Sequence, residues 1–174
     1  QGFAHVGNSG IWAESPDRIL VAQRGETRLP IPIPEEYGGG GEERTLVTNS
    51  IVLEELGYGD AALALALTAP SQFANAILDY GTEEQKQRFL PDLASGRKRG
   101  GLALTEPSGG TDMANLQTTA TKDGEEYSIN GTKMFITNAV EAGTYVVLAS
   151  HDFDLRTRGI DALVVEGDFD GITV

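Results

Sequence analysis

The stretch Leu102-Ala-Leu-Thr-Glu-Pro-Ser-Gly-Gly-Thr-Asp112 joins an apolar run to a turn that is rich in glycine and hydroxyl groups. Leu102 and Leu104 occupy alternate positions, which predicts one face of a strand. Pro107 ends the run, because proline cannot donate a hydrogen bond to a sheet. A strand that ends in such a turn offers backbone N–H groups and side-chain hydroxyls at one place. The stretch therefore favours binding of a polar, phosphate-bearing cofactor without a Walker loop.

The sequence that follows this stretch predicts further β-strands. A second segment of interest, Met134-Phe-Ile-Thr-Asn138, sets an aromatic ring two residues before a threonine. Asp123-Gly124 is a two-residue hairpin signal, and Asn130-Gly131 is a further turn or bulge signal. Apolar and β-branched residues predict strands on both sides of these turns. The predicted strands cover residues 117–122, 127–129, 132–136, 145–149 and 160–165, and another begins at 171–174.

The first half of the chain predicts helices. Residues 42–56 carry an apolar stripe at helical spacing, and Gly57 is placed to end that helix. Asp60 can cap a second helix over residues 61–80, which is apolar nearly all round and should be buried, with Pro70 marking a kink or break. Thr82-Glu-Glu-Gln85 is a capping box that opens a short helix over 83–90, limited by Pro91.

The first 41 residues give weaker signals. Ser15 could cap a short helix with Pro16 at its first position. Alternating prolines require Leu29-Pro-Ile-Pro-Ile-Pro34 to be extended, and the glycines after Tyr37 indicate a flexible turn. We therefore predict an α+β fold, with a helical, bundle-like domain over residues 1–98 and an incomplete antiparallel β-barrel domain over residues 99–174.

Composition excludes several classes of function. The 174 residues contain no cysteine, which removes disulfides, cysteine-ligated metals and cysteine nucleophiles. Only His5 and His151 occur, without the paired spacing of a metal site, so no metal is expected. The formal charge of −13 disfavours binding to nucleic acid or to an anionic membrane. The sequence contains no run of about 18 apolar residues, so a membrane span is not expected.

Six motifs follow one another from about residue 30 to the end of the chain. They are Pro34-Glu-Glu-Tyr-Gly-Gly39, Glu54-Glu-Leu-Gly57, Tyr80-Gly-Thr-Glu-Glu-Gln-Lys86, Leu90-Pro-Asp-Leu-Ala-Ser-Gly96, Leu104-Thr-Glu-Pro-Ser-Gly-Gly-Thr-Asp112, and Ile129-Asn-Gly-Thr-Lys133 with Phe135-Ile-Thr-Asn138. In this order and spacing they resemble the FAD-dependent acyl-CoA dehydrogenase family. Only the family's N-terminal and middle portions are matched.

The resemblance implies a three-domain enzyme: an N-terminal helical domain, a middle β-barrel domain and a C-terminal four-helix domain. It implies FAD as cofactor and α,β-dehydrogenation of an acyl-CoA thioester to the trans-2-enoyl-CoA. A carboxylate removes the α-proton, the β-hydride passes to flavin N5, and the electrons leave to an electron-transferring flavoprotein. The family is usually homotetrameric and takes part in the β-oxidation of fatty acids.

The resemblance also assigns roles to seven residues. Leu102 and Leu104 are expected to present backbone groups to the isoalloxazine edge, and Thr105 to hydrogen-bond its pyrimidine side. Gly110 and Thr111 are expected near the pyrophosphate, with Thr111 also bordering the thioester arm of acyl-CoA. Phe135 is expected against the flavin ring, where many members have tryptophan, and Thr137 near N5. Thr111 stands where serine is common, and Gly109 where alanine is common. The seven residues expected to contact the cofactor are Leu102, Leu104, Thr105, Gly110, Thr111, Phe135 and Thr137.

The resemblance places the catalytic carboxylate in the C-terminal helical domain, so no catalytic residue is expected in this chain. Glu106 is a candidate base by chemistry alone, but the family's motif glutamate is not the base, and we interpret Glu106 as structural. We expect the ordered or proteolysed part of a longer enzyme. Alternatives are a split gene whose partner supplies the base, a non-catalytic module, and an acyl-CoA oxidase or nitroalkane-oxidase-like flavoenzyme. No targeting signal is visible near Gln1, which favours a prokaryotic cytoplasm over the mitochondrial matrix.

Overall fold

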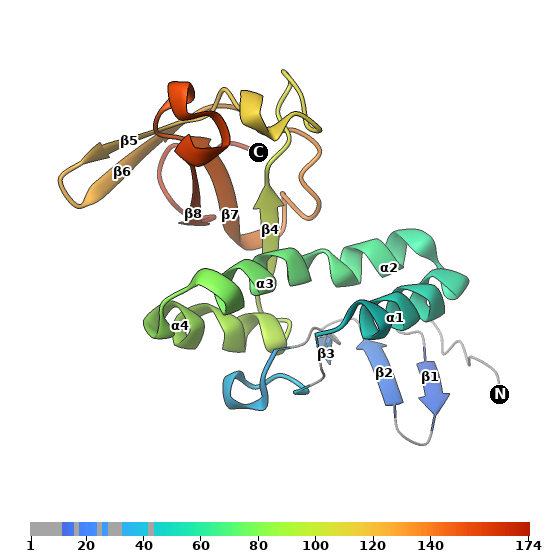
Figure 1. Ribbon diagram of the computed structural model, residues 1–174. Coiled ribbons are helices and arrows are strands. Elements are labelled where there is room, and N and C mark those ends of the chain that lie inside the picture. The colour runs from blue at the N-terminus through green and yellow to red at the C-terminus, as the bar shows by residue number, and fades with distance from the viewer. Residues whose placement is uncertain (1–11, 16–17, 24–25, 28–32, 42–43) are drawn as a thin grey trace. The chain divides into compact units, whose positions relative to one another are not determined.

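The computed structural model divides the chain into two compact units, residues 1–100 and residues 101–174 (Figure 1). The first unit contains the helices and a small sheet, and the second contains most of a larger sheet. The helices followed by the larger sheet fit the α+β fold that the sequence predicts, but the small sheet before the helices was not predicted. The structure describes residues 12–15, 18–23, 26–27, 33–41 and 44–174.

A three-stranded sheet precedes the helices. It contains β1 (Trp12–Ser15), β2 (Arg18–Gln23) and β3 (Glu26–Thr27), and each neighbouring pair is antiparallel. Ser15 pairs with Arg18 at the end of β1, so the predicted helix cap at Ser15 is wrong. The strand-forming run at residues 18–23 outweighs the local capping signal, because its pairing with β1 supplies backbone partners. Pro16 and Asp17 lie outside the described residues.

The predicted linker contains a folded turn. Residues 28–32 lie outside the described residues, but Pro34 is extended (φ −54°, ψ 149°) and a 3-10 helix follows over Glu35–Tyr37. The turn is closed by Gly38 in the left-handed region (φ 83°), where a side chain would be strained. Tyr37 is buried and its hydroxyl donates to the carboxylate of Glu83 at 3.0 Å. The segment is therefore anchored to the helices rather than being a flexible turn.

Four α-helices form the body of the first unit: α1 (Leu46–Gly59), α2 (Ala61–Thr68), α3 (Pro70–Tyr80) and α4 (Glu83–Ala94). Side-chain caps begin three of them. The Thr45 hydroxyl accepts from Thr48 N at 3.0 Å, and the Asp60 carboxylate accepts from Leu63 N at 2.9 Å, as predicted for Asp60. The capping box between Thr82 and Gln85 is also confirmed in both directions.

Two helix boundaries differ from the predictions. Helix α1 continues past Gly57 to Gly59, because the backbone N–H of Asp60 still bonds to Leu56 O at 3.0 Å. Helix α4 does not stop at Pro91 but continues through it to Ala94. Proline removes one backbone donor, yet Leu90 and Leu93 on either side of it are buried. The burial of these leucines outweighs the lost hydrogen bond.

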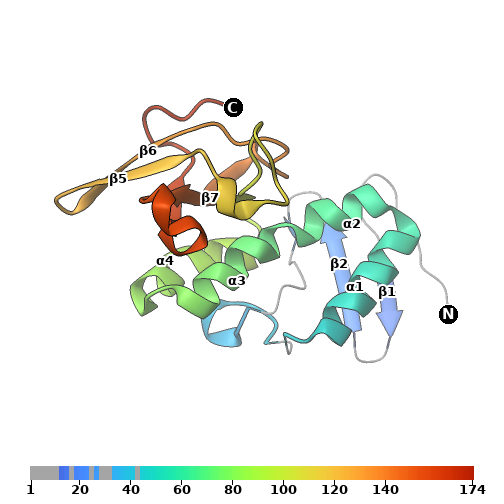
Figure 2. The same cartoon turned by 45° about the horizontal axis from the view of Figure 1, so that its top comes forward.

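Pro70 does mark a break, since α2 ends at Thr68 and Pro70 is the first residue of α3. Ala69 between them keeps helical angles (φ −54°, ψ −38°), so α2 and α3 run on in nearly one direction while α1 and α4 lie beside them (Figures 1 and 2). Among the described residues, only Ala61–Tyr80 is long and apolar enough to cross a membrane, with a mean hydropathy of 1.4. Length and composition do not distinguish such a segment from a core helix.

Burial within the helices is uneven. Among the described residues of the first unit, most buried side chains belong to α3 and α4, where Phe73 and Phe89 meet edge to face with ring centroids 6.0 Å apart. The apolar stripe predicted on α1 is largely exposed, with Leu46 at 85% and only Leu56 buried. In α2 only Ala64 is buried, so the expectation that the apolar helix over residues 61–80 is buried is wrong for its first half.

The second unit is built on a mixed sheet. Its strands are β4 (Arg99–Ala103), β5 (Thr119–Asp123), β6 (Glu126–Asn130), β7 (Ala142–Ser150) and β8 (Ile160–Glu166). The order is β4-β7-β5-β6, with β8 antiparallel to β7. Thr119 of β5 pairs with Ser150 of β7 in parallel, so a purely antiparallel sheet is wrong, and the path of strands does not close into a barrel.

Three predictions about local strand structure need correction. The β5–β6 hairpin forms, but Asp123 pairs with Glu126, so its loop is Gly124-Glu125 rather than Asp123-Gly124. Gly124 takes the positive φ (62°) that the first loop position requires. Residues 171–174 form no strand. Residues 132–136, also predicted as a strand, are irregular, for reasons that become visible at the site.

We expect Phe73→Ala to lower the free energy of unfolding by about 3–5 kcal/mol, because Phe73 is completely buried and its removal leaves a cavity beside Phe89. Tyr80→Ala, in the same helix at 89% exposure, is the matched control and should change it by only about 0.5 kcal/mol. Urea unfolding of the full-length gene product measures both. Equal effects of the two substitutions would contradict the packing described for α3.

Candidate functional site

The Leu102–Asp112 stretch ends β4 and then makes a tight turn. Strand β4 stops at Ala103, and Glu106 and Gly109 then form an antiparallel bridge with reciprocal backbone hydrogen bonds of 3.0 Å. Pro107 and Ser108 form the exposed corner between them. The fixed φ of proline suits this corner, which needs no backbone donor from that residue. The predicted strand and turn are therefore both present, with Leu104 one residue beyond the strand.

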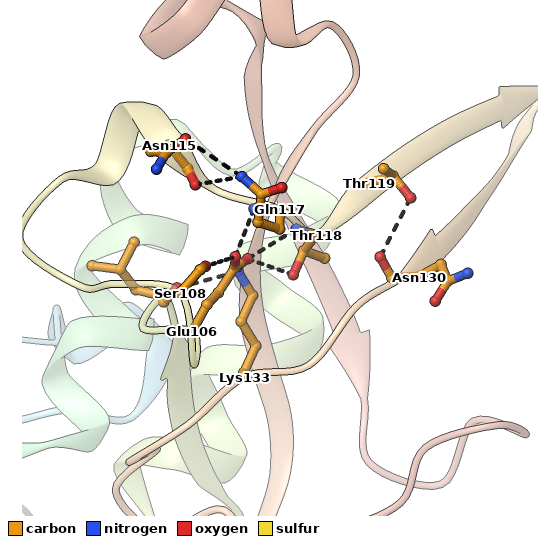
Figure 3. A network of polar contacts seen from close by, with 9 residues as sticks. Glu106, Ser108, Asn115, Gln117, Thr118, Thr119, Asn130 and Lys133 are labelled. Atoms are coloured by element: carbon orange, nitrogen blue, oxygen red, sulfur yellow. Dashed lines mark hydrogen bonds and ion pairs between the residues drawn. The ribbon is translucent and has the colours of Figure 1, made fainter.

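The carboxylate of Glu106 is buried at the centre of this region (Figure 3). Its Oε1 accepts from Thr118 N at 3.0 Å, Thr118 Oγ1 at 2.5 Å and Lys133 Nζ at 2.8 Å. Its Oε2 accepts from Gln117 N at 2.6 Å and Ser108 Oγ at 3.2 Å. Five donors therefore saturate one carboxylate, which is how a buried charge is tolerated.

This environment sets the ionisation of Glu106. Burial by itself raises the pKa of the carboxyl, since it penalises the charged form. The hydrogen bonds from Lys133, Thr118 and the backbone of Gln117 act in the opposite direction and prevail, so the pKa falls from 4.5 to about 2. Glu106 is thus a structural anchor that is ionised at neutral pH and is not poised to take up a proton there.

Lys133 connects the second segment to the first. Its ammonium donates to Glu106 and also to Leu104 O at 3.2 Å, and the Lys133 side chain is only 11% exposed. The next residue, Met134, donates its backbone N–H to Thr105 O at 2.8 Å. Three consecutive residues, 104 to 106, therefore accept from Lys133 and Met134, which brings the two predicted cofactor-binding segments side by side.

The same contacts explain why residues 132–136 are not a strand. Strand β6 ends at Asn130, and Gly131 then lies directly against Thr118: a Cβ at Gly131 would come within 2.3 Å of Thr118 Oγ1 and 2.8 Å of its Cα. Four residues after Gly131, Phe135 has a positive φ of 59°. A bulky residue rarely adopts this conformation, which interrupts any extended pairing. Tertiary contacts here outweigh the β-propensity of the segment.

The structure gathers several of the predicted site residues into one region. A Cβ at Gly110 would come within 3.1 Å of the Thr105 side chain, so Thr105 and Gly110 are in close contact. Phe135 is 86% exposed on the neighbouring segment, with Thr137 two residues beyond it and also exposed. Leu102 and Leu104 are half-buried, and Leu104 O is occupied by Lys133. Thr111 is exposed just after Gly110.

The donors of this region suit a polar cofactor. Within the described part of the chain, the hydroxyls of Thr105, Thr111 and Thr137 have no protein partner, and neither do the backbone N–H groups of Gly110 and Thr111. Together with the exposed Phe135 ring, these groups offer hydrogen-bond donors for phosphate or flavin oxygens and one flat apolar surface. The residues present therefore fit FAD.

Sequence reasoning missed three residues that organise the site: Thr118, Gly131 and Lys133. None of them carries a recognisable binding signature by itself. Lys133 follows Asn130-Gly131 and precedes an apolar run, and a lysine in that position could have suggested a buried partner for Glu106. Among the described residues, no group of three or more histidine, aspartate or glutamate side chains could hold a metal ion.

Family models match both units. The model for "Acyl-CoA dehydrogenase, N-terminal domain" matches residues 13–97, and the model for "Acyl-CoA dehydrogenase, middle domain" matches residues 101–174. The chain belongs to the acyl-CoA dehydrogenase family. Members of this family are FAD-dependent oxidoreductases.

Relatives in sequence agree with the family models. The chain is 38% identical over 162 residues to an acyl-CoA dehydrogenase of Bacillus subtilis (strain 168), which covers 92% of this chain and 42% of the relative. It is 44% identical over 142 residues to a short-chain specific acyl-CoA dehydrogenase of Megasphaera elsdenii, covering 80% of this chain and 37% of the relative. The chain thus spans less than half the length of these curated relatives.

Solved structures share the fold. A structure titled for an electron transferring flavoprotein of Acidaminococcus fermentans is 42% identical with a TM-score of 0.77, covering 84% of this chain and 39% of that one. A glutaryl-CoA dehydrogenase from Mycobacterium smegmatis in complex with FADH2 is 34% identical with a TM-score of 0.74, covering 83% and 36%. A prolyl acyl carrier protein oxidase is 37% identical with a TM-score of 0.75, covering 82% and 37%.

We expect Gly131→Ala to lower the free energy of unfolding by about 1–3 kcal/mol, because the new methyl group would overlap both the side chain and the Cα of Thr118. Gly57→Ala is the control, since no atom lies within 4 Å of a Cβ there and alanine favours a helix. Thermal unfolding of both variants measures the effect. If Gly131→Ala were as stable as the wild type, the close packing on Thr118 would be wrong.

Glu106 should make stability depend on acid. Its folded pKa of about 2 lies below the ordinary 4.5, so its contribution of about 3 kcal/mol is complete above pH 4.5 and is lost as pH falls toward 2. The difference in unfolding free energy between the wild type and Glu106→Gln should shrink across that window. Glu126→Gln, exposed on β6, is the control. A difference that stays constant from pH 5 to pH 2 would contradict this ionisation.

Proposed function

We propose that this chain forms the flavin-contacting part of an acyl-CoA dehydrogenase that converts an acyl-CoA thioester to the trans-2-enoyl-CoA. The observation that carries the proposal is the hydrogen bond from Met134 N to Thr105 O, which joins the two segments while the hydroxyls of Thr105, Thr111 and Thr137 keep no partner among the described residues. When bound, FAD supplies the acceptor for the β-hydride. The chain's own residues bind and orient the cofactor and the thioester.

Each residue has a role that its chemistry supports. Thr105 and the backbone of Leu102 and Leu104 hydrogen-bond the pyrimidine edge of the flavin, and Thr137 hydrogen-bonds near N5. Such bonds favour the more negative, reduced ring.

The remaining contacts hold the phosphates and cover the ring. The backbone N–H of Gly110 and the Thr111 hydroxyl bind the pyrophosphate, and Thr111 borders the thioester arm. The exposed Phe135 ring packs against the flavin and excludes water from it. Its positive φ supports this role, because strained backbone concentrates at functional sites.

The general base is proposed to lie outside this chain. Glu106 is the one buried acidic side chain among the described residues, and its five donors leave it no free position to accept the α-proton. A carboxylate from a further domain or a partner chain would therefore complete the reaction. We propose transfer of the electrons to an electron-transferring flavoprotein, a homotetrameric assembly, and a prokaryotic cytoplasmic location.

Short-chain acyl-CoA is the proposed substrate class, because the Megasphaera elsdenii relative, 44% identical, is named as short-chain specific. The second candidate function is an oxidase acting on a related acyl thioester. It is favoured by the 37% identity to the prolyl acyl carrier protein oxidase. The two functions differ in whether the reduced flavin reacts rapidly with oxygen or waits for a protein acceptor.

The visible spectrum tests the proposal. The full-length gene product should be yellow with bound FAD, and anaerobic addition of butyryl-CoA should bleach the flavin band more readily than a long-chain acyl-CoA. Exposure to air should restore the band only slowly, and rapid restoration would favour the oxidase. A protein that binds no FAD, or whose flavin no acyl-CoA of a short, branched and long panel bleaches, would overturn the proposal.

A further inference from the structure

Two residues outside the predicted flavin contacts, Lys133 and Glu106, join the two segments that carry those contacts. We propose that Lys133, held by Glu106, is a positioning residue that sets the distance between Thr105 and Thr137, and through it the affinity for FAD and the reduction potential of the bound flavin. The inference rests on the proposed function. Neither Lys133 nor Glu106 is proposed to touch the reacting atoms.

The segment that carries Phe135 and Thr137 needs such an anchor. Residues 131–137 belong to no strand, so no ladder of backbone hydrogen bonds fixes them. The positive φ of Phe135 costs conformational energy that surrounding contacts must offset. In the described part of the chain, the backbone bond from Met134 N to Thr105 O is the one main-chain tie between this segment and residues 102–112.

Lys133 holds the first segment on both sides of Thr105. Its ammonium bonds Leu104 O at 3.2 Å and Glu106 Oε1 at 2.8 Å, while Met134 N bonds Thr105 O between them. Loss of these two side-chain bonds of Lys133 would therefore release the segment immediately before Met134 and two residues before Phe135. Figure 3 shows the lysine side chain reaching from its segment up to the carboxylate.

Glu106 makes the anchor rigid. Besides Lys133, its carboxylate is held by the backbone of Gln117 and Thr118, just before β5, and by the hydroxyls of Thr118 and Ser108. The side chains of Glu106 and Lys133 are 2% and 11% exposed, so water does not compete strongly for either charge. The ammonium thus has an acceptor that is fixed to the sheet before any cofactor binds.

A purely structural ion pair is the rival interpretation. Buried pairs often contribute little net stability compared with an apolar replacement, so stability alone does not separate the two. The distinguishing property is the flavin: a positioning residue changes the affinity and potential of bound FAD, whereas a pair that only stabilises the fold changes neither. The experiment therefore compares flavin properties with unfolding of the same variants.

Lys133→Met in the full-length gene product is the test. Methionine keeps the apolar stem and leaves Glu106 with its four other donors. We expect FAD to bind about tenfold more weakly, because the two hydrogen bonds that hold the Thr137 segment to Leu104 and Glu106 are lost. The reduction potential of the remaining flavin should fall, since looser bonds to N5 and the pyrimidine edge stabilise the reduced ring less. Lys122→Met, on the exposed face of β5, is the matched control and should change neither property.

Two further variants make the outcome decisive. Lys133→Arg keeps the charge and the donors and should recover most of the FAD affinity. Glu106→Gln keeps the shape of the anchor but removes its charge, and it should also weaken FAD binding. This variant replaces Lys133→Met as the test if Lys133→Met does not fold. One result would overturn this inference alone: the wild type binds FAD and is bleached by butyryl-CoA, while the variants unfold at a lower temperature but keep the wild-type FAD affinity and flavin reduction potential. A wild type without FAD would overturn the proposed function as well.

Discussion

The second unit depends on satisfying one buried negative charge. The Glu106 carboxylate is stable in the interior only because five donors surround it, and those donors come from three separate parts of the chain. Satisfying the charge therefore fixes the turn at Ser108, the residue Thr118 that precedes β5 and the irregular segment at Lys133 in one arrangement. The close approach of Gly131 to Thr118 follows from the same arrangement. The need to satisfy one buried carboxylate therefore determines the arrangement of the segments at the candidate site.

Features that depend on neighbouring residues could be predicted from the sequence. The caps at Asp60 and Thr82 need only a side chain and a backbone N–H three residues away, so their patterns were sufficient. The break at Pro70 and the β5–β6 hairpin are local in the same sense. The motif order also identified the family, because those motifs are short and contiguous.

Features that depend on distant contacts could not be predicted. Nothing near Pro91 reveals that the burial of Leu90 and Leu93 carries the helix through a proline. The segment after Asn130 has the composition of a strand, but its conformation is set by Thr118 and Glu106, more than ten residues earlier in the chain. The parallel pairing of Thr119 with Ser150 is equally invisible in a local pattern. The positions of the site residues are decided by these distant contacts.

The ion pair of Glu106 and Lys133 makes contacts that an apolar pair at the same position would not make. An apolar pair of similar volume could fill the same space without the desolvation cost of two charges. It would not, however, bond Leu104 O or the backbone N–H groups of Gln117 and Thr118, which would then lose these partners. The carboxylate and ammonium are thus selective for one register between the two segments, because a shift of one residue would leave several polar groups unsatisfied at once. That selectivity matters more at a cofactor site than the small net stability of the pair, since flavin contacts tolerate little displacement.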